Sequence, residues 1–410
     1  MHAILEYIGV TLIIVIILFS TMYAINASTT RLSHIKEEQL CTVAERLMDK
    51  IILTPGYPYD WGYNFSLYNG SLTDFGLAEY GSRTPYELDP EKILRLVNLT
   101  QLPNPLYISG EEIAELLGIK EKYFFVLEMK PLINIYSRVL TYKTLGHGKG
   151  QGTSSLPEKI EVTLTNYYGV NIAGANVTGI YILVWVKSLG QNQSYNYYSP
   201  TPVKSNITWF DGKCILDFSE ELDNALDEIK QKSYKKLFGM VLIHVNWHGF
   251  VSVGYSLPYS LGDIVEGYVI GNYLIVNYNV TIIPRAAILI KDEVLQAVPE
   301  YKSLLQVTAV EIVDEDNPAY RVINRGAKKY RVYRLEYVEK LSSHIIMVGT
   351  YTPGRGGMRI VLLPISRMPM LYIRYGTYGE PVNAVNIVRI AYFFNYPYIV
   401  RLTLWRKEEG

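Results

Sequence analysis

The sequence predicts an α+β fold with a long N-terminal helix, a small α/β cap and two β-rich, immunoglobulin-like sandwich modules. Three observations lead to this fold class. An uncharged apolar run from Ile8 to Ile25 continues into an amphipathic stretch that ends at Thr54-Pro55-Gly56. Helix-capping signals follow between residues 89 and 118. From residue 158 onward, short apolar runs alternate with turn residues at the spacing of a β-sandwich.

The helix is predicted over residues 1–54. Its apolar run spans roughly 27 Å at 1.5 Å per residue, close to the hydrocarbon core of a bilayer. We expect a retained single-pass transmembrane helix and not a cleaved signal peptide, because the run is long and leads into a helix, not a cleavage loop. In the second half, apolar residues recur at three-to-four spacing, which predicts a face packed under a globular head. They are Ile35, Leu40, Val43, Ala44, Leu47, Met48, Ile51 and Ile52.

The cap is predicted over residues 55–145. Asp89 stands before Pro90, which is the arrangement of a helix N-cap followed by a first-turn proline. Ser109 and Glu112 have the spacing of a capping box. Residues 123–129 then read as a strand.

A linker and two β-rich modules complete the predicted organisation. The Gly-rich stretch 146–157 is interpreted as the linker. It is not predicted to be a phosphate-binding loop, because Lys149 is not followed by Ser or Thr and no helix follows the glycines. Residues 158–260 are predicted to form a β-sandwich, with a polar helix near 220–232. Residues 261–410 are predicted to form a C-terminal β-rich domain whose last strand alternates between apolar and polar side chains.

Composition limits the function classes. The formal net charge is zero, so there is no electrostatic basis for binding nucleic acid. Two cysteines cannot form a disulfide framework. Cys41 and Cys214 either pair across a long loop or remain two unrelated buried thiols, and the second alternative is favoured.

Asn-x-Ser/Thr sequons occur at eight positions, where roughly two or three are expected by chance. This excess favours an extracellular C-terminal ectodomain, although the flanking charges weakly favour the opposite orientation. Asn26 lies too near the apolar run to be modified. The predicted glycosylation sites are Asn64, Asn69, Asn98, Asn176, Asn192, Asn206 and Asn279.

Candidate metal ligands are weak. His244 and His248 would lie about 13 Å apart on one strand, too far to share an ion unless a turn intervenes. Asp314 and Asp316 could offer oxygen ligands to Ca²⁺, but no glycine sets the bend of an EF-hand loop. No catalytic motif is found, and we predict no cofactor, no metal and no catalytic residue.

Glu6 is the residue with the strongest functional expectation. A carboxylate at the edge of hydrocarbon is costly unless it is paired or neutralised. Glu6 either pairs with the α-amino group of a neighbouring subunit in an assembly or simply extends to the polar headgroups.

Two segments carry a resemblance to a known family. His2-Ala3-Ile4-Leu5-Glu6-Tyr7, followed by the apolar run, resembles the mature start of archaeal type IV pilin-like proteins of the class III signal type, although His2 stands where Gln is usual. A second block is similar to one in archaeal membrane-anchored, pilin-like surface proteins. It comprises Leu53–Gly62, Gly76–Gly81, Tyr86–Lys92 and Glu115–Gly118. The resemblance implies a location and an architecture, but no chemistry.

These observations together predict a non-enzymatic, membrane-anchored extracellular surface protein that acts as a pilin-like structural subunit, an adhesin or an envelope component. Its expected partners are the lipid bilayer and copies of itself or other envelope proteins. The alternative is an anchored extracellular enzyme or binding protein that acts on glycans or peptides.

Overall fold

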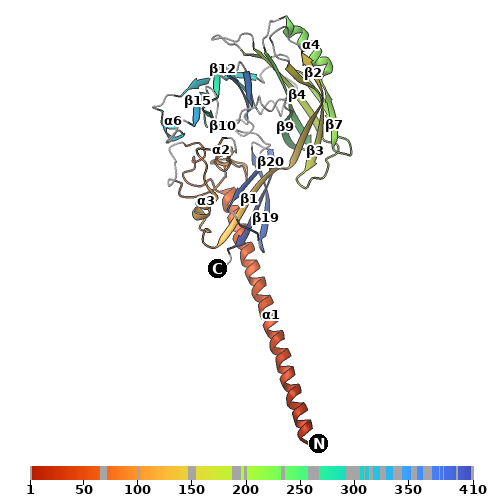
Figure 1. Cartoon of the computed structure of the whole chain (residues 1–410), viewed down its shortest axis with the longest axis vertical. Coiled ribbons are helices and arrows are strands. Elements are labelled where there is room, and N and C mark those ends of the chain that lie inside the picture. The colour runs from red at the N-terminus through yellow and green to blue at the C-terminus, as the bar shows by residue number, and fades with distance from the viewer. Residues whose placement is uncertain are drawn as a thin grey trace.

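The computed structural model shows a long helix projecting from a β-rich head (Figure 1). Strand accounts for 46% and helix for 23% of the structure. The helix α1 (His2–Leu53) leaves the base of the head beside the C-terminus. The structure describes residues 2–64, 72–98, 102–145, 154–186, 195–197, 201–231, 236–256, 267–291, 305–308, 310–313, 317–323, 329–335, 344–351, 358–362, 372–377, 379–381, 383–393 and 396–407.

The C-terminal part of α1 is built into the head. Its apolar stripe packs against Trp61, Phe75 and the strands at the end of the chain. The helix stops where the Thr54 hydroxyl donates to the Lys50 carbonyl and Pro55 cannot continue the backbone ladder. The predicted packing face is therefore confirmed for six of its eight residues, whereas Val43 is half-buried and the side chain of Ile35 lies outside the described residues. Its buried members, each at most 7% exposed, are Leu40, Ala44, Leu47, Met48, Ile51 and Ile52.

Two short helices follow, and their predicted caps are confirmed. The Asp89 carboxylate accepts from the Glu91 amide at the start of α2 (Pro90–Leu94). Both arms of the capping box at Ser109 are present at the start of α3 (Gly110–Leu116). These local signals are readable from sequence because each cap satisfies amides within its own first turn.

One antiparallel sheet joins segments from opposite ends of the chain. Its strand order is β18 (Ile373–Gly376), β1 (Tyr123–Pro131), β20 (Tyr396–Arg406) and β19 (Val385–Phe393). β1 pairs with β20 along its whole length. Alternate side chains on both strands point into the core that also holds α1, and these include Leu127, Leu402 and Leu404. The outer face of this sheet carries the polar residues.

Residues 133–256 form a β-sandwich. One sheet has the order β2 (Ile133–Leu145), β3 (Ser154–Asn166), β7 (Lys213–Asp217). The other has the order β5 (Tyr195–Tyr197), β4 (Asn176–Val186), β8 (Lys236–Trp247), β9 (Phe250–Ser256), and β6 (Val203–Ile207) also pairs with β4. The two sheets and α4 (Ser219–Lys230) enclose one apolar cluster. The far face of β4 and β8 joins the α1 core, which explains why residues 180–185 are apolar and buried without alternation.

Two further antiparallel sheets lie between the sandwich and the C-terminal strands in sequence. The first has the order β10 (Gly267–Ile270), β11 (Tyr273–Asn277), β15 (Tyr330–Leu335), β14 (Val310–Ile312). The second has the order β13 (Leu305–Thr308), β12 (Thr281–Lys291), β16 (His344–Tyr351), β17 (Met358–Leu362). The first sheet and α6 (Pro318–Ile323) share an apolar cluster with Leu94, Leu102 and Leu106.

The predicted α+β fold class is wrong, because the protein is mostly antiparallel β-sheet. The residues expected to form an α/β cap supply β1, which pairs with β18 and β20 and not with a strand of a separate cap sheet. In place of two immunoglobulin-like modules there is one sandwich over residues 133–256. The remaining strands belong to three other sheets. Residues 146–153 of the predicted linker lie outside the described residues. Its last four residues, 154–157, belong to β3.

The predicted single-pass membrane anchor is also corrected. Among the described residues, no helix combines the length and the apolarity that crossing a bilayer requires. The expected localisation, a single-pass membrane protein with an extracellular C-terminal ectodomain, is therefore not supported.

Candidate assembly site

The part of α1 outside the head is apolar and uncovered. Eleven large hydrophobic side chains between Leu12 and Ile25 are 43–78% exposed. Eight of them are consecutive, from Leu12 to Phe19, so they cover every face of the helix. An α-helix that is apolar all round is normally buried. This segment, Leu12–Ile25, is called the apolar shaft below.

The Ser20 and Thr21 hydroxyls of the apolar shaft are satisfied within the helix. The Ser20 hydroxyl donates to the Ile16 carbonyl at 2.9 Å, and the Thr21 hydroxyl donates to the Ile17 carbonyl at 2.9 Å. No residue from Leu12 to Ile25 is charged. Burying the shaft therefore buries no ion, and of its hydroxyls only that of Tyr23 would need a new partner.

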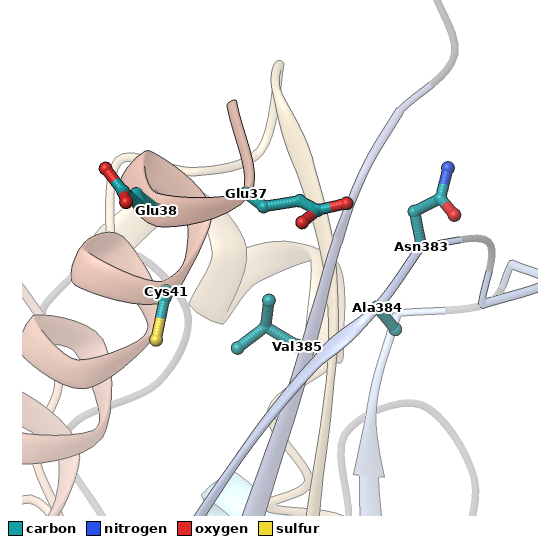
Figure 2. A pocket seen from close by; sticks show the side chains of 6 residues that line it. All are labelled: Glu37, Glu38, Cys41, Asn383, Ala384 and Val385. Atoms are coloured by element: carbon teal, nitrogen blue, oxygen red, sulfur yellow. The ribbon is translucent and has the colours of Figure 1, made fainter. Parts of the chain in front are cut away.

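A hollow of about 440 Å³ lies where α1 meets the head (Figure 2). Glu37, Glu38 and Cys41 line it from the helix, and Asn383 to Val385 line it from the start of β19. Figure 2 shows the Glu37 carboxylate directed across the hollow toward β19, whereas Glu38 points away. The lining is mostly apolar, from Cys41, Ala384 and Val385, and the Glu37 carboxylate gives it one acidic group. The same helix carries Arg31 and Lys36.

Two ion pairs flank the buried part of α1, but packing dominates its attachment. Lys50 lies 2.6 Å from Asp74, and Asp49 lies 4.0 Å from Arg389. All four side chains are between 37% and 49% exposed. Exposed pairs of this kind contribute about 0–1 kcal/mol each. Burial of the apolar stripe contributes more, at about 1.5–3 kcal/mol for each large side chain.

The structure places the predicted glycosylation sites unevenly. Asn98, Asn176, Asn206 and Asn279 are exposed, and Asn64 is half-buried. Asn69 and Asn192 lie outside the described residues, so the modification of all seven sites stays a prediction.

Several sequon threonines have structural partners. The buried Thr208 hydroxyl of the Asn206 sequon donates to the Ile172 carbonyl at 2.9 Å. The buried Thr178 hydroxyl of the Asn176 sequon lies 2.9 Å from the Ser205 hydroxyl. These two threonines therefore have a structural role whether or not the asparagines are modified.

The weak metal candidates gain no support. His244 is buried on β8, and burial lowers its pKa to about 4, while His248 adopts a positive φ in the turn before β9. In the part of the chain that the structure describes, no three His, Cys, Asp or Glu side chains are grouped to hold an ion. Asp314 and Asp316 lie outside it.

The two cysteines and Glu6 complete the predicted residues. Cys41 and Cys214 are both free thiols, so the predicted absence of a bond between them is confirmed, but only Cys214 is buried and Cys41 is half-buried. Burial raises the pKa of Cys214 to about 11. Glu6 belongs to α1, but its side chain lies outside the described residues. Its role in assembly stays a prediction.

Comparison with known proteins gives no relatives: no family model matches the chain, and neither the curated proteins nor the solved structures contain a significant match. The resemblance to pilin-like proteins is therefore untested. Sequence reasoning missed the hollow beside Cys41, because its two sides come from segments more than 300 residues apart and no spacing pattern connects them.

Proposed function

We propose that this chain is a non-enzymatic structural subunit, pilin-like in organisation, that assembles with copies of itself by bundling the apolar shaft of α1. The observation that carries the proposal is the contrast within one helix. Residues 40–52 present a buried stripe to the head, whereas residues 12–25 are apolar on every face and uncovered.

The energetics favour several neighbours over one. The eleven shaft side chains are already about half covered by their own helix, so burying the remainder contributes about 1 kcal/mol each, or about 10 kcal/mol in total. Association costs about 4–15 kcal/mol in lost translational and rotational freedom. A single partner helix covers only one face of the shaft. A bundle of copies covers all faces and supplies enough apolar contact.

Copies of this chain also fit the base of the helix. The hollow beside β19 contains the Glu37 carboxylate in a mostly apolar lining, and Arg31 or Lys36 of a second copy would supply the opposite charge. Glu6 would lie inside the bundle, where its carboxylate needs a cationic partner from a neighbouring subunit.

The test is the oligomeric state of the full chain, measured by sedimentation velocity over a wide concentration range and by electron microscopy. Wild-type protein is expected to form large assemblies. The double variant Ile16→Lys/Phe19→Lys should be monomeric, because it places two charges in the bundle core. The matched control is Val388→Lys/Ile390→Lys, which charges two side chains that are 44% and 43% exposed on the head. This control should assemble like wild type.

Two results would contradict the proposal. Wild-type protein that stays monomeric at all concentrations would remove the basis for a bundle. Equal loss of assembly in both double variants would show that general exposed apolar area drives association, not the shaft. Glu6→Gln should weaken assembly while leaving the head folded, and unchanged assembly would exclude its predicted role.

A further inference from the structure

A cluster of tyrosines and charged residues lies on the outer face of the sheet that contains β1, with Tyr372 and Arg374 exposed and the other members half-buried. Glu128 and Lys130 lie on β1, Tyr372 precedes β18, and Arg374 lies on β18. Arg401 lies on β20, and Tyr167 follows β3. We call these six residues the tyrosine–cation face.

Strand register brings the charged residues into one row. Glu128 pairs directly with Arg374 on one side and with Arg401 on the other. The row crosses three strands and is about 10 Å wide. Lys130 follows Glu128 by two residues, so it lies on the same face about 7 Å further along the strand. The intervening Met129 is buried in the core.

Two tyrosine rings flank Lys130. Its ammonium lies 4.8 Å from the centre of the Tyr372 ring and 5.5 Å from the centre of the Tyr167 ring. The Arg401 guanidinium lies 5.3 Å from the Tyr167 ring. These are cation–π distances, which hold the cations and rings in a fixed arrangement. The Tyr372 hydroxyl donates to the Glu128 carboxylate at 3.1 Å, which fixes this ring as well.

The tyrosine–cation face carries a net positive charge. The face contains three cations and one carboxylate, and the Glu128 oxygens lie 3.9 Å from Arg374 and 3.5 Å from Arg401. Among the described residues, no carboxylate lies within ion-pair distance of Lys130. The Arg374 side chain is 68% exposed, so most of its five donors face solvent. The face is therefore ready to accept a carboxylate.

The rings select among anions. Tyr372 is 50% exposed, and the neighbouring Tyr168 is 82% exposed and lies edge-on to Tyr167 at 5.1 Å. An aromatic surface beside an arginine fork favours a ligand that combines an anionic group with an apolar face. A small inorganic anion offers only the charge. A sugar ring that carries a carboxylate offers both, because one side of the ring is lined by C–H groups.

From this arrangement we propose that the tyrosine–cation face binds an acidic saccharide, with Arg374 and Lys130 holding its carboxylate and Tyr372 contacting its ring. The Tyr372 hydroxyl, which donates its proton to Glu128, would accept a hydrogen bond from a sugar hydroxyl. This binding site is independent of the apolar shaft, because none of its residues belongs to α1. A failure of assembly would therefore leave it untouched.

The test is calorimetric titration of the full chain with a trimer of galacturonic acid, using maltotriose and inorganic phosphate as comparison ligands. We expect the acidic trimer to bind and the other two to bind at least tenfold more weakly. Arg374→Gln should weaken binding about tenfold or more, since hydrogen bonds to charged groups contribute about 1.5–3 kcal/mol. Tyr372→Leu should weaken binding by a similar factor, whereas Tyr372→Phe, which keeps the ring, should weaken it less.

The matched control is Arg138→Gln. The Arg138 side chain is 71% exposed and pairs with Glu161 on the sandwich, away from the face. Binding of this variant should equal that of wild type, and thermal melts should show that every variant is folded. The proposal is overturned if the trimer does not bind, if phosphate binds as well as the trimer, or if Arg138→Gln and Arg374→Gln lose equal affinity.

Discussion

Replacing Ile51 by alanine tests whether α1 is an integral part of the head. Ile51 is fully buried and belongs to the cluster that also contains Trp61, Leu402 and Leu404. The substitution removes three carbon atoms, worth about 2.4 kcal/mol in transfer free energy, and leaves a cavity. We therefore expect the free energy of unfolding to fall by about 2–5 kcal/mol.

Urea denaturation monitored by tryptophan fluorescence measures this change. With a slope of about 3 kcal/mol per molar urea, a loss of 3 kcal/mol lowers the midpoint by about 1 M. The neighbouring Leu53→Ala is the control, because Leu53 is 47% exposed and its truncation should change stability much less. If both variants shift the midpoint equally and slightly, α1 does not share the core of the head and the interpretation of its buried half is refuted.

Three further predictions concern buried polar groups. Lys92→Met should lower the free energy of unfolding by about 3 kcal/mol, because the fully buried ammonium donates to two backbone carbonyls and lies 3.6 Å from the Asp89 carboxylate. Burial lowers the pKa of His244 to about 4, so the unfolded chain binds more protons than the folded chain between about pH 6.5 and pH 4. The free energy of unfolding should therefore fall by about 2 kcal/mol as the pH drops from 7 to 5. The variant His244→Leu should lack this part of the pH dependence of stability. Alkylation of the native protein followed by mass spectrometry should label Cys41 and spare the buried Cys214 until the chain unfolds.

Each of these predictions has a clear contrary result. A Lys92→Met variant as stable as wild type would mean that the carbonyls find other donors. Identical pH profiles for wild type and His244→Leu would mean that the histidine is solvated. Equal labelling of the two thiols would place Cys214 at the surface.

Sequence reasoning succeeded where structure is decided by neighbours along the chain. The caps at Asp89 and Ser109 are satisfied within one helical turn, and the buried stripe of α1 repeats with the helical period. It failed where structure is decided by distant segments. The register that sets Glu128 against Arg374 and Arg401 joins residues nearly 250 or more positions apart, and no local pattern encodes it. The fold class was wrong for the same reason, because the strand expected in a separate cap belongs to a sheet completed by the C-terminus.

The candidate sites divide in the same way. The apolar shaft could be predicted from sequence, since it is one uncharged apolar run, and so could the half of the helix that the head covers, since its apolar residues repeat with the helical period. The tyrosine–cation face could not be predicted from the sequence, because its residues come from three strands and two loops that are far apart along the chain. An abundance of tyrosine, 36 against 11 phenylalanines, indicated only that half-buried aromatic positions would be common.

The two proposals reinforce each other through the continuity of α1. No proline or glycine interrupts the helix between Val10 and Thr54, so the shaft and the buried stripe form one rigid element. The stripe packs in the same core as β1 and β20, and these strands carry Glu128, Lys130 and Arg401 on their outer face. In a bundle, each subunit would therefore present its tyrosine–cation face in a fixed orientation relative to the shaft. Sites that bind one acidic sugar weakly would then be repeated along the assembly. A polysaccharide that contacts several copies would bind far more tightly than a single unit, because each contact after the first is intramolecular.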